Sequence, residues 1–415
     1  MSSHNGGVSV SLLSGWLPWA LRAGAAGAVV AAVWRADRRW WTRRAPVAAG
    51  VAALLAIVLA VVVDAALGQQ EPLPAGLWFW FGMAMFALVV AVMPGRVWQR
   101  LVALGAVVLA VATVGSALNA FVGYYPTVGD AVGELTGQPV SGQVDADGLG
   151  SVSPETSTGR VVAVDIPDTY SHFAHRTEFV YLPPAWFRSG RKPRLPVIEL
   201  IGAEFASPDN WIRAGGAVTT ADAYARAHDG RAPIMVFADA SGGFSVDTEC
   251  VDGPHGNAET HLDADIPAYV DAHFHAAPGE WAVAGWSMGG TCAIDLAVEH
   301  PELYHRFLDI SGDLGPNTGD RAETVARLFG GDASAWAAHD PLTVLGRDPH
   351  YVGVTGVFAD GAREHRTTHA ARRLAAACRR DGIDTVVVVR PGGHTWQFAE
   401  QEFAALLPAL LPTPV

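Results

Sequence analysis

Hydrophobic residues are distributed unevenly along the chain. Four long apolar stretches fill the first 123 residues, at 12–34, 47–67, 77–93 and 101–122. Each is close to the roughly 20 residues that a helix needs to cross a bilayer, so residues 1–123 are predicted to form a block of four transmembrane helices. A signal peptide is an alternative for the first stretch alone, but no basic segment precedes it and three further spans follow.

The short loops between these spans alternate in charge. The loop 35–44 is dense in arginine, and the loop after the third span contributes Arg96 and Arg100. The loop 68–76 carries Glu71 and no Lys or Arg, and the segment after the fourth span is acidic. Because basic loops stay in the cytoplasm, both termini are predicted to lie outside, which makes this a multi-pass protein of the cell membrane.

The pattern changes after the fourth span. Residues 124–160 are rich in Gly, Ser, Thr, Pro and acids, which predicts a flexible extracytoplasmic linker. From residue 161 to 415, short apolar runs alternate with helical stretches, which is typical of an α/β domain with a mostly parallel sheet. The expected strands are 161–166, 177–182, 197–201, 234–238, 281–284, 307–310, 352–358 and 385–389. The expected helices are 219–228, 261–275, 291–300, 322–329, 366–380 and 395–411.

Composition narrows the function classes. The net charge of −13 argues against a nucleic-acid partner, which requires a basic face. Three cysteines cannot form a Cys-rich zinc site; Cys250 and Cys292 are the candidates for one disulfide, with buried free thiols as the alternative. His365 and His369 offer no third ligand, so no metal is expected. The absence of a G-x-G-x-x-G or Walker-type loop between a strand and a helix argues against a nucleotide cofactor. Other histidines are predicted to lie on solvated faces: His255, His261, His273 and His275.

One short motif points to nucleophilic chemistry. Residues 285–289, Gly-Trp-Ser-Met-Gly, follow an apolar run long enough for a buried strand, and a helical stretch follows them. Strand, sharp turn and helix are the context of a nucleophile elbow, which presents Ser287 at the strand tip. The backbone N–H of Met288 would then face a developing oxyanion.

A serine nucleophile needs a base and an acid that orients the base. His394 directly follows the last predicted strand, beside two glycines, and is the candidate base. The acid should follow the preceding strand, where Asp360 is the first choice because it lies nearest the strand tip. Glu364 and then Asp313 are the alternatives. The second oxyanion donor is expected in the loop after strand 197–201.

That loop offers the N–H of Ala203 or of Glu204 as the donor, although a glycine such as Gly202 is also common in ordinary loops. The catalytic prediction therefore consists of a serine, a histidine with one of three carboxylates, and two backbone N–H groups. The expected reaction is attack on an ester carbonyl through an acyl-enzyme on Ser287.

These residues resemble a known esterase family of the α/β-hydrolase superfamily. The family includes esterase-D-like enzymes and antigen 85-type mycolyltransferases, and the resemblance covers residues 177–411. It rests on Tyr-Leu-Pro-Pro at 181–184, Gly-Trp-Ser-Met-Gly-Gly at 285–290 and Gly-His-Thr-Trp at 393–396. It implies an α/β-hydrolase fold without a cofactor, Ser287 as nucleophile, His394 as base, and an oxyanion hole from Met288 and residues 202–204.

Two departures from the family pattern matter for function. Esterase-D-like members have a G-x-x-D acid and mycolyltransferases a glutamate, whereas this chain has Gly356-x-x-x-Asp360 with Glu364 behind it. The membrane block lies outside the resemblance. We therefore expect a membrane-anchored, extracytoplasmic serine esterase or acyltransferase, acting on an ester such as a cell-envelope lipid or glycolipid. The alternative is a non-catalytic envelope binding or scaffolding protein on a hydrolase fold.

Overall fold

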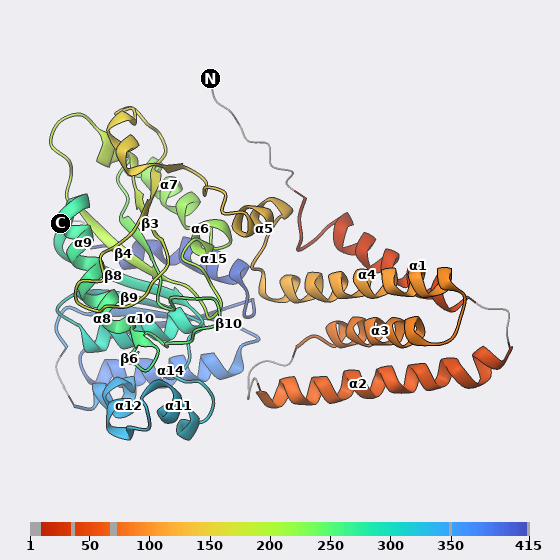
Figure 1. Cartoon of the computed structure of the whole chain (residues 1–415). Helices are drawn as coiled ribbons and strands as arrows, with labels where there is room; N and C mark the ends of the chain where they lie inside the picture. Colours follow the sequence, from red (N-terminus) through yellow and green to blue (C-terminus); the bar gives the residue numbers. More distant parts are fainter. Residues whose placement is uncertain (1–9, 35–37, 67–72, 348–350, 413–415) are drawn as a thin grey trace. The chain divides into compact units, whose positions relative to one another are not determined.

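The chain divides into two compact units, Met1–Gln138 and Pro139–Val415. The structure, a computed structural model, describes residues 10–34, 38–66, 73–347 and 351–412 (Figure 1). Arg35 and Glu71, which contribute to the predicted orientation, lie outside the described residues. Each unit has its own architecture.

The N-terminal unit contains the four predicted membrane helices. They are α1 (Trp16–Val33), α2 (Ala45–Ala66), α3 (Ala75–Val92) and α4 (Val97–Val122), and a π-helical turn, Trp40–Arg44, leads into α2. Helix α4 packs against α1 and α3, and α3 packs against α2 (Figure 1). All four are long and apolar enough to cross a membrane, as the sequence predicts.

These four helices expose most of their apolar surface. Only 11% to 28% of the apolar window of each span is buried. Helix α2 exposes branched side chains along its length, among them Leu54, Ile57, Val58 and Val61. The buried positions are mostly alanines, which let helix backbones approach closely. An exposed apolar surface of this extent fits a lipid environment.

The segment 124–160 is more ordered than the predicted linker. Helix α5 (Val128–Leu135) begins at Thr127, whose hydroxyl accepts the Asp130 N–H while the Asp130 carboxylate accepts the Thr127 N–H. This capping box stabilises a short helix that composition does not reveal. Farther on, β1 (Gln143–Val144) pairs with the first strand of the main sheet, and Ala146–Ser151 forms a 3-10 turn.

The C-terminal unit is built on a nine-stranded sheet with the order β1-β2-β3-β5-β4-β8-β9-β10-β11. Strand β3 runs antiparallel to both neighbours, and the remaining pairs are parallel, which confirms the predicted mostly parallel sheet. The strands are β2 (Arg160–Val164), β3 (Glu178–Leu182), β4 (Leu195–Ile201), β5 (Ile234–Ala238), β8 (Ala276–Trp286), β9 (Tyr304–Ile310), β10 (Thr355–Gly361) and β11 (Asp384–Arg390). Strands β6 (Asp252–Gly253) and β7 (Gly256–Asn257) form a separate hairpin.

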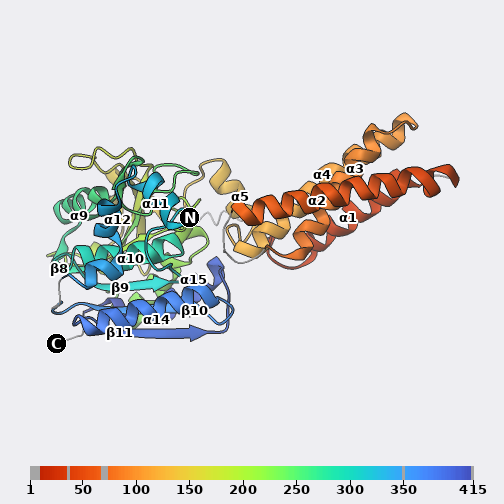
Figure 2. The ribbon, with the colours of Figure 1, turned by 90° about the horizontal axis from the view of Figure 1, so that it is seen from below.

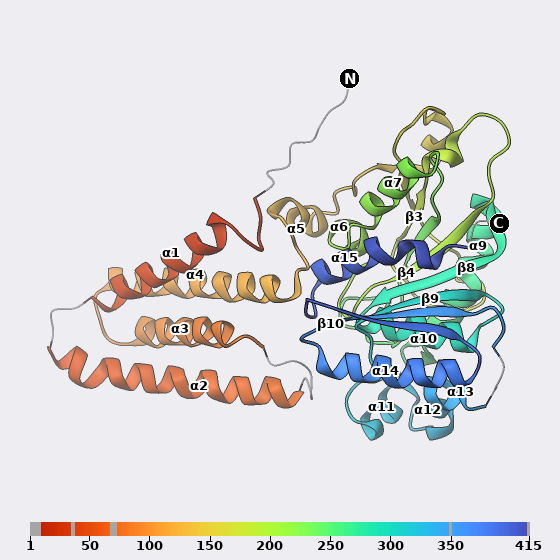
Figure 3. The same cartoon turned by 180° about the vertical axis from the view of Figure 1, so that it is seen from behind.

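Helices cover both faces of this sheet. Helices α10 and α14 lie on one face, seen from that side in Figure 2, and α7 and α15 lie on the other (Figure 3). The helices are α6 (Asn210–Arg213), α7 (Ala217–Ala227), α8 (Ala258–Thr260), α9 (Ile266–Phe274), α10 (Met288–Glu299), α11 (Arg321–Leu328), α12 (Ala333–His339), α13 (Pro341–Leu345), α14 (His365–Arg380) and α15 (Trp396–Leu406). A π-helical turn, His261–Asp265, precedes α9, and 3-10 turns span Pro184–Phe187 and Leu407–Leu410.

The disulfide candidate is confirmed. Cys250 and Cys292 are bonded, which joins the loop after β5 to helix α10, and Cys378 is a buried free thiol. The bond fixes a loop close to the start of the helix that follows Ser287.

Candidate active site

Ser287 lies at a sharp turn between the central strand β8 and helix α10. Its backbone has φ 60° and ψ −121°, a conformation that non-glycine residues rarely adopt. A side chain at Gly285 would collide with the Gly289 carbonyl, and one at Gly289 would collide with the Ile201 carbonyl. The two glycines therefore allow the close backbone approach that holds Ser287 in this strained turn.

Two hydrogen bonds connect this serine to a histidine and a carboxylate. The Ser287 Oγ lies 2.8 Å from His394 Nε2, and His394 Nδ1 lies 2.6 Å from Glu364 Oε1. A neutral His394 with its proton on Nδ1 donates to Glu364 and accepts from the serine hydroxyl. The arrangement is that of a nucleophile, a general base and an acid that orients the base.

Two hydrogen bonds to the other carboxylate oxygen hold Glu364 in place. Its Oε2 accepts a hydrogen bond from the Ser311 hydroxyl at 3.0 Å and one from the Gly361 N–H at 2.7 Å. Ser311 directly follows β9 and has a positive φ of 55°. Glu364 is buried, whereas the side chain of His394 remains about 30% exposed. The carboxylate is thus fixed inside the protein, and the imidazole reaches the surface. No sequence pattern points to this role of Ser311.

The first choice of acid, Asp360, is wrong as the hydrogen-bond partner of His394. Strand β10 runs to Gly361, beyond the predicted end at 358, and this places Asp360 inside the sheet, in register with Val389 of β11. Burial, together with the charge of Glu364, raises the pKa of Asp360 to about 7. The first residue able to turn back from the strand end towards His394 is Glu364.

Asp313, the third candidate, lies apart from the imidazole. Its carboxylate accepts from Arg366 at 2.8 Å and from the Asn317 amide at 3.1 Å. Its own N–H donates to the Thr291 hydroxyl, at 2.8 Å. Asp313 therefore joins the loop after β9 to helices α10 and α14.

The predicted oxyanion donors lie around the elbow. Met288 is the first residue of α10, where backbone N–H groups have no partner within the helix. The loop after β4 touches the first turn of that helix, because a Cβ at Gly289 would lie within 2.6 Å of the Gly202 carbonyl oxygen. Ala203 and Glu204 follow in this loop, and burial, with a contribution from Asp247, raises the pKa of Glu204 to about 7. The N–H groups of Met288 and of residues 203–204 therefore belong to adjoining backbone segments.

Tryptophans surround the histidine. The ring of Trp286, the residue before the nucleophile, lies 5.1 Å from the His394 ring and 4.6 Å from the Trp396 ring. Trp396 in turn contacts Trp211, whose indole N–H donates to the Ile201 carbonyl. These rings pack the histidine loop against the elbow and the loop after β4.

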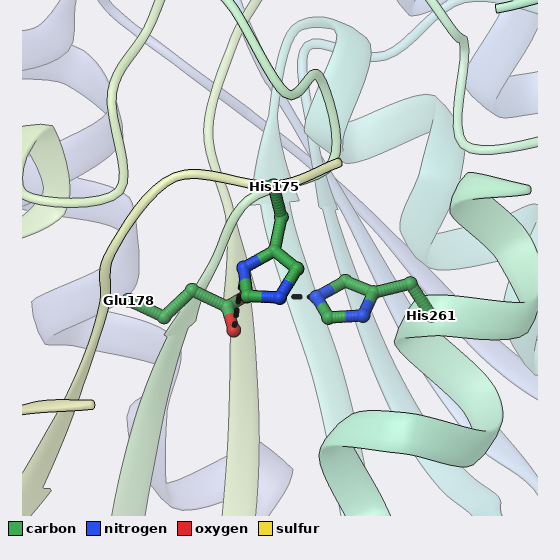
Figure 4. Close-up of side chains that lie close together, drawn as sticks. All are labelled: His175, Glu178 and His261. Carbon is green, nitrogen blue, oxygen red and sulfur yellow. Dashed lines mark hydrogen bonds and ion pairs between the residues drawn. The ribbon is translucent and has the colours of Figure 1, made fainter. Parts of the chain in front are cut away.

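A second polar cluster is buried at the same edge of the sheet. It contains His175, Glu178 and His261, whose ligand atoms lie within 4.8 Å of one another (Figure 4). The prediction that His261 lies on a solvated face is wrong, because this side chain is fully buried. Burial lowers the pKa of His261, but hydrogen bonds and charges from Glu178 and Asp265 outweigh this and raise it.

The hydrogen bonds of this cluster compete with metal coordination. Nδ1 and Nε2 of His175 lie 2.9 and 2.7 Å from the carbonyl oxygens of Arg176 and Ile166. Because a carbonyl oxygen only accepts, the protonated ring nitrogen is engaged by one of these carbonyls, and the other nitrogen also faces a carbonyl oxygen rather than an open position for a cation. A second group of possible metal ligands consists of Glu259, Glu299 and His339, and these side chains form ion pairs with one another and with His300.

The comparisons with known proteins agree with this geometry. Residues 174–412 match the family model described as "Putative esterase". The chain belongs to this family. It is 30% identical over 340 residues to an uncharacterized protein of Corynebacterium glutamicum, with 79% of each chain covered. That share is longer than the C-terminal unit, so the similarity extends into the N-terminal unit.

Two further proteins that are similar to this chain have names that state an activity. The diacylglycerol acyltransferase/mycolyltransferase Ag85A of Mycobacterium bovis is 31% identical over 103 residues, which cover 21% of this chain and 30% of that protein. The solved S-formylglutathione hydrolase of Agrobacterium tumefaciens superposes with a TM-score of 0.50 at 16% identity, covering 61% of this chain and 95% of that one. The fold is therefore that of an α/β-hydrolase, and the protein is a serine esterase or acyltransferase.

Proposed function

We propose that Ser287, His394 and Glu364 form the catalytic triad of this enzyme. As Ser287 Oγ attacks an ester carbonyl, its proton passes to His394 Nε2. Collapse of the tetrahedral intermediate breaks the ester C–O bond, and the departing alcohol takes that proton, leaving an acyl-serine. Water or a sugar hydroxyl then attacks the acyl group and gives its proton to Nε2. As the second intermediate collapses, the bond from the acyl carbon to Ser287 Oγ breaks and Oγ takes this proton back, which releases the acid or the new ester.

The observation that carries this proposal is the continuous hydrogen-bonded series from Glu364 through His394 to Ser287. A buried carboxylate on Nδ1 stabilises the imidazolium that forms in each half-reaction. The N–H of Met288 and one N–H from Ala203 or Glu204 hold the oxyanion. Each such donor is typically worth about 10²–10³ in rate.

We further propose that the substrate carries a long acyl chain, as in an envelope lipid or glycolipid. Phe205 and Phe244 expose 42% and 68% of their surface, and their rings lie 5.5 Å apart. Phe205 follows Glu204 in the proposed oxyanion loop, so an acyl chain leaving the site would pass this aromatic pair. The acyltransferase name of the Mycobacterium relative supports the same substrate class.

The substrate proposal is tested with p-nitrophenyl esters of increasing chain length. Phe244→Ala should lower kcat/KM for long-chain esters about tenfold and leave acetate hydrolysis almost unchanged, since one aromatic contact is worth about 1 kcal/mol or more. Equal losses on all chain lengths would contradict an acyl-binding role.

We propose that the catalytic domain lies outside the cytoplasmic membrane, anchored by α1–α4. The arginines before α2 and the acidic segment after α4 favour this orientation. The Cys250–Cys292 disulfide is typical of an oxidising compartment. Protease added to intact spheroplasts should remove the C-terminal domain, and its protection would reverse the orientation.

Labelling of the full chain with a fluorophosphonate tests the enzyme against the scaffold alternative. The detergent-solubilised protein should be labelled on Ser287, and Ser287→Ala should abolish the signal. Folded protein that resists labelling would favour a non-catalytic envelope protein.

A further inference from the structure

A cavity of about 480 Å³ opens between three helices of the N-terminal unit. It lies where α1 and α3 begin and where α4 ends. Its walls are almost entirely apolar or small, with contributions from Leu77, Trp80, Ala117 and Phe121. One lining side chain is charged, Arg22 of α1. A cation in an apolar wall of a membrane helix is costly unless an anion accompanies it.

Arg22 has no protein anion beside it in the part of the chain that the structure describes. Its guanidinium group lies over the ring of Trp19, with the guanidinium carbon 5.0 Å from the ring centroid. No ion pair to Asp or Glu forms there among the described residues. The guanidinium therefore keeps its donors for a ligand, and its planar fork matches phosphate oxygens.

The position of the cavity also fits a lipid headgroup. Trp16 and Trp19, in the first turn of α1, are two-thirds exposed, as is typical of side chains at a membrane interface. Lipid phosphates lie at this level, and the acyl chains run from there into the hydrocarbon region. With both termini outside, this end of the helices faces the outer leaflet.

We propose that this cavity is a binding site for an anionic phospholipid, with one acyl chain against the apolar wall and the phosphate on Arg22. The site rests on the proposed insertion of the four helices in a membrane, and it is independent of the chemistry at Ser287. It gives the N-terminal unit a function beyond anchoring: retention of a lipid in the same chain as the acyl-transferring domain.

Native mass spectrometry of the full chain in detergent tests the site, with phosphatidylglycerol as the anionic lipid and phosphatidylcholine as the zwitterionic control. The wild-type chain should retain one phosphatidylglycerol in preference to phosphatidylcholine. Arg22→Gln should weaken this retention about tenfold, the loss expected for one charge-assisted contact. Arg43→Gln, at an exposed arginine before α2, should leave it unchanged.

A second pair of variants tests the apolar part of the site. Gly76 lines the cavity, and a Cβ there would meet no atom within 4 Å, so Gly76→Trp fills the space without disturbing the backbone. Gly50 is equally open but lies on the exposed side of α2, away from the cavity, so Gly50→Trp is the matched control. Only Gly76→Trp should displace the lipid.

The proposal would be overturned if Arg22→Gln bound phosphatidylglycerol as strongly as the wild-type chain. Equal binding of phosphatidylcholine, or binding of oleate without phosphatidylglycerol, would overturn it as well. Ser287→Ala should bind the lipid normally, so failure of this site and failure of the catalytic proposal give different results. Melting temperatures of all variants in detergent show which chains remain folded.

Discussion

The two units place apolar residues in opposite environments. In the N-terminal unit, α2 exposes Val58 and its neighbours over a helix of 22 residues, and the buried contacts use alanine. In the C-terminal unit, apolar side chains such as Val197 and Val283 are fully buried in strands of 7 and 11 residues. The proposed catalytic side chains follow the ends of these and other strands. Apolar content alone does not distinguish the units; the length of each apolar run does.

The largest expected effect shows whether ester hydrolysis depends on the C-terminal unit alone. Ser287→Ala should lower kcat/KM for p-nitrophenyl butyrate by at least about 10⁴-fold, because the nucleophile acts as a unit with its base. Arg22→Gln should leave hydrolysis of this short ester unchanged. A large loss from Arg22→Gln in folded protein would mean that the two units share the active site.

The next effect separates the two carboxylates near the end of β10. Glu364→Gln should lower kcat about 10³–10⁴-fold, since the amide neither stabilises the imidazolium nor fixes its tautomer. Asp360→Asn should retain activity within a few-fold of wild type. Steady-state kinetics of the two purified variants measures both losses. A larger loss in Asp360→Asn than in Glu364→Gln would indicate that Asp360 is the acid.

Two exposed valines, one in each unit, allow the surroundings of the two units to be compared. Val58 of α2 is 50% exposed and Val352, before β10, is 88% exposed. Val58→Arg should impair membrane insertion by about 3 kcal/mol, whereas Val352→Arg should change neither insertion nor stability, because its side chain already meets water. Membrane fractionation measures both. Normal insertion of Val58→Arg would argue against α2 as a span.

A further expected effect concerns the pH dependence of stability. Folded Asp360 keeps its proton up to about pH 7, whereas the unfolded chain releases it near the ordinary value of 3.8. The unfolded state therefore binds fewer protons between these values, and stability falls as pH rises from about 4 to about 7, by up to roughly 4 kcal/mol. Asp360→Asn should flatten this part of the stability profile in denaturant titrations. An unchanged slope would contradict the raised pKa.

Much of the architecture follows from the sequence because its signals are local. The four long apolar helices and the core strands are defined by apolar runs, and the elbow at Ser287 is defined by two glycines with a strand before and a helix after. The choice of acid depends on where β10 ends, and pairing with β11 extends that strand to Gly361. Local sequence does not report such a register, and for that reason it favours Asp360.

Other features depend on contacts between distant segments. His261 is buried because Glu178, 83 residues earlier, meets it across the fold, and Ser311 contacts Glu364 across 53 residues. The predicted linker contains β1 because the edge of β2 is free to pair with it. None of these partners can be read from the spacing of residues along one segment.

The central claim is that Ser287 becomes acylated with the help of His394 and Glu364. Intact mass spectrometry of the full chain, quenched rapidly after mixing with p-nitrophenyl palmitate, tests it most directly. We expect the mass of one palmitoyl adduct, which digestion locates on the peptide that contains Ser287, present in Asp360→Asn and missing in Ser287→Ala. An adduct on another residue, or ester cleavage by Ser287→Ala at the wild-type rate, would contradict it.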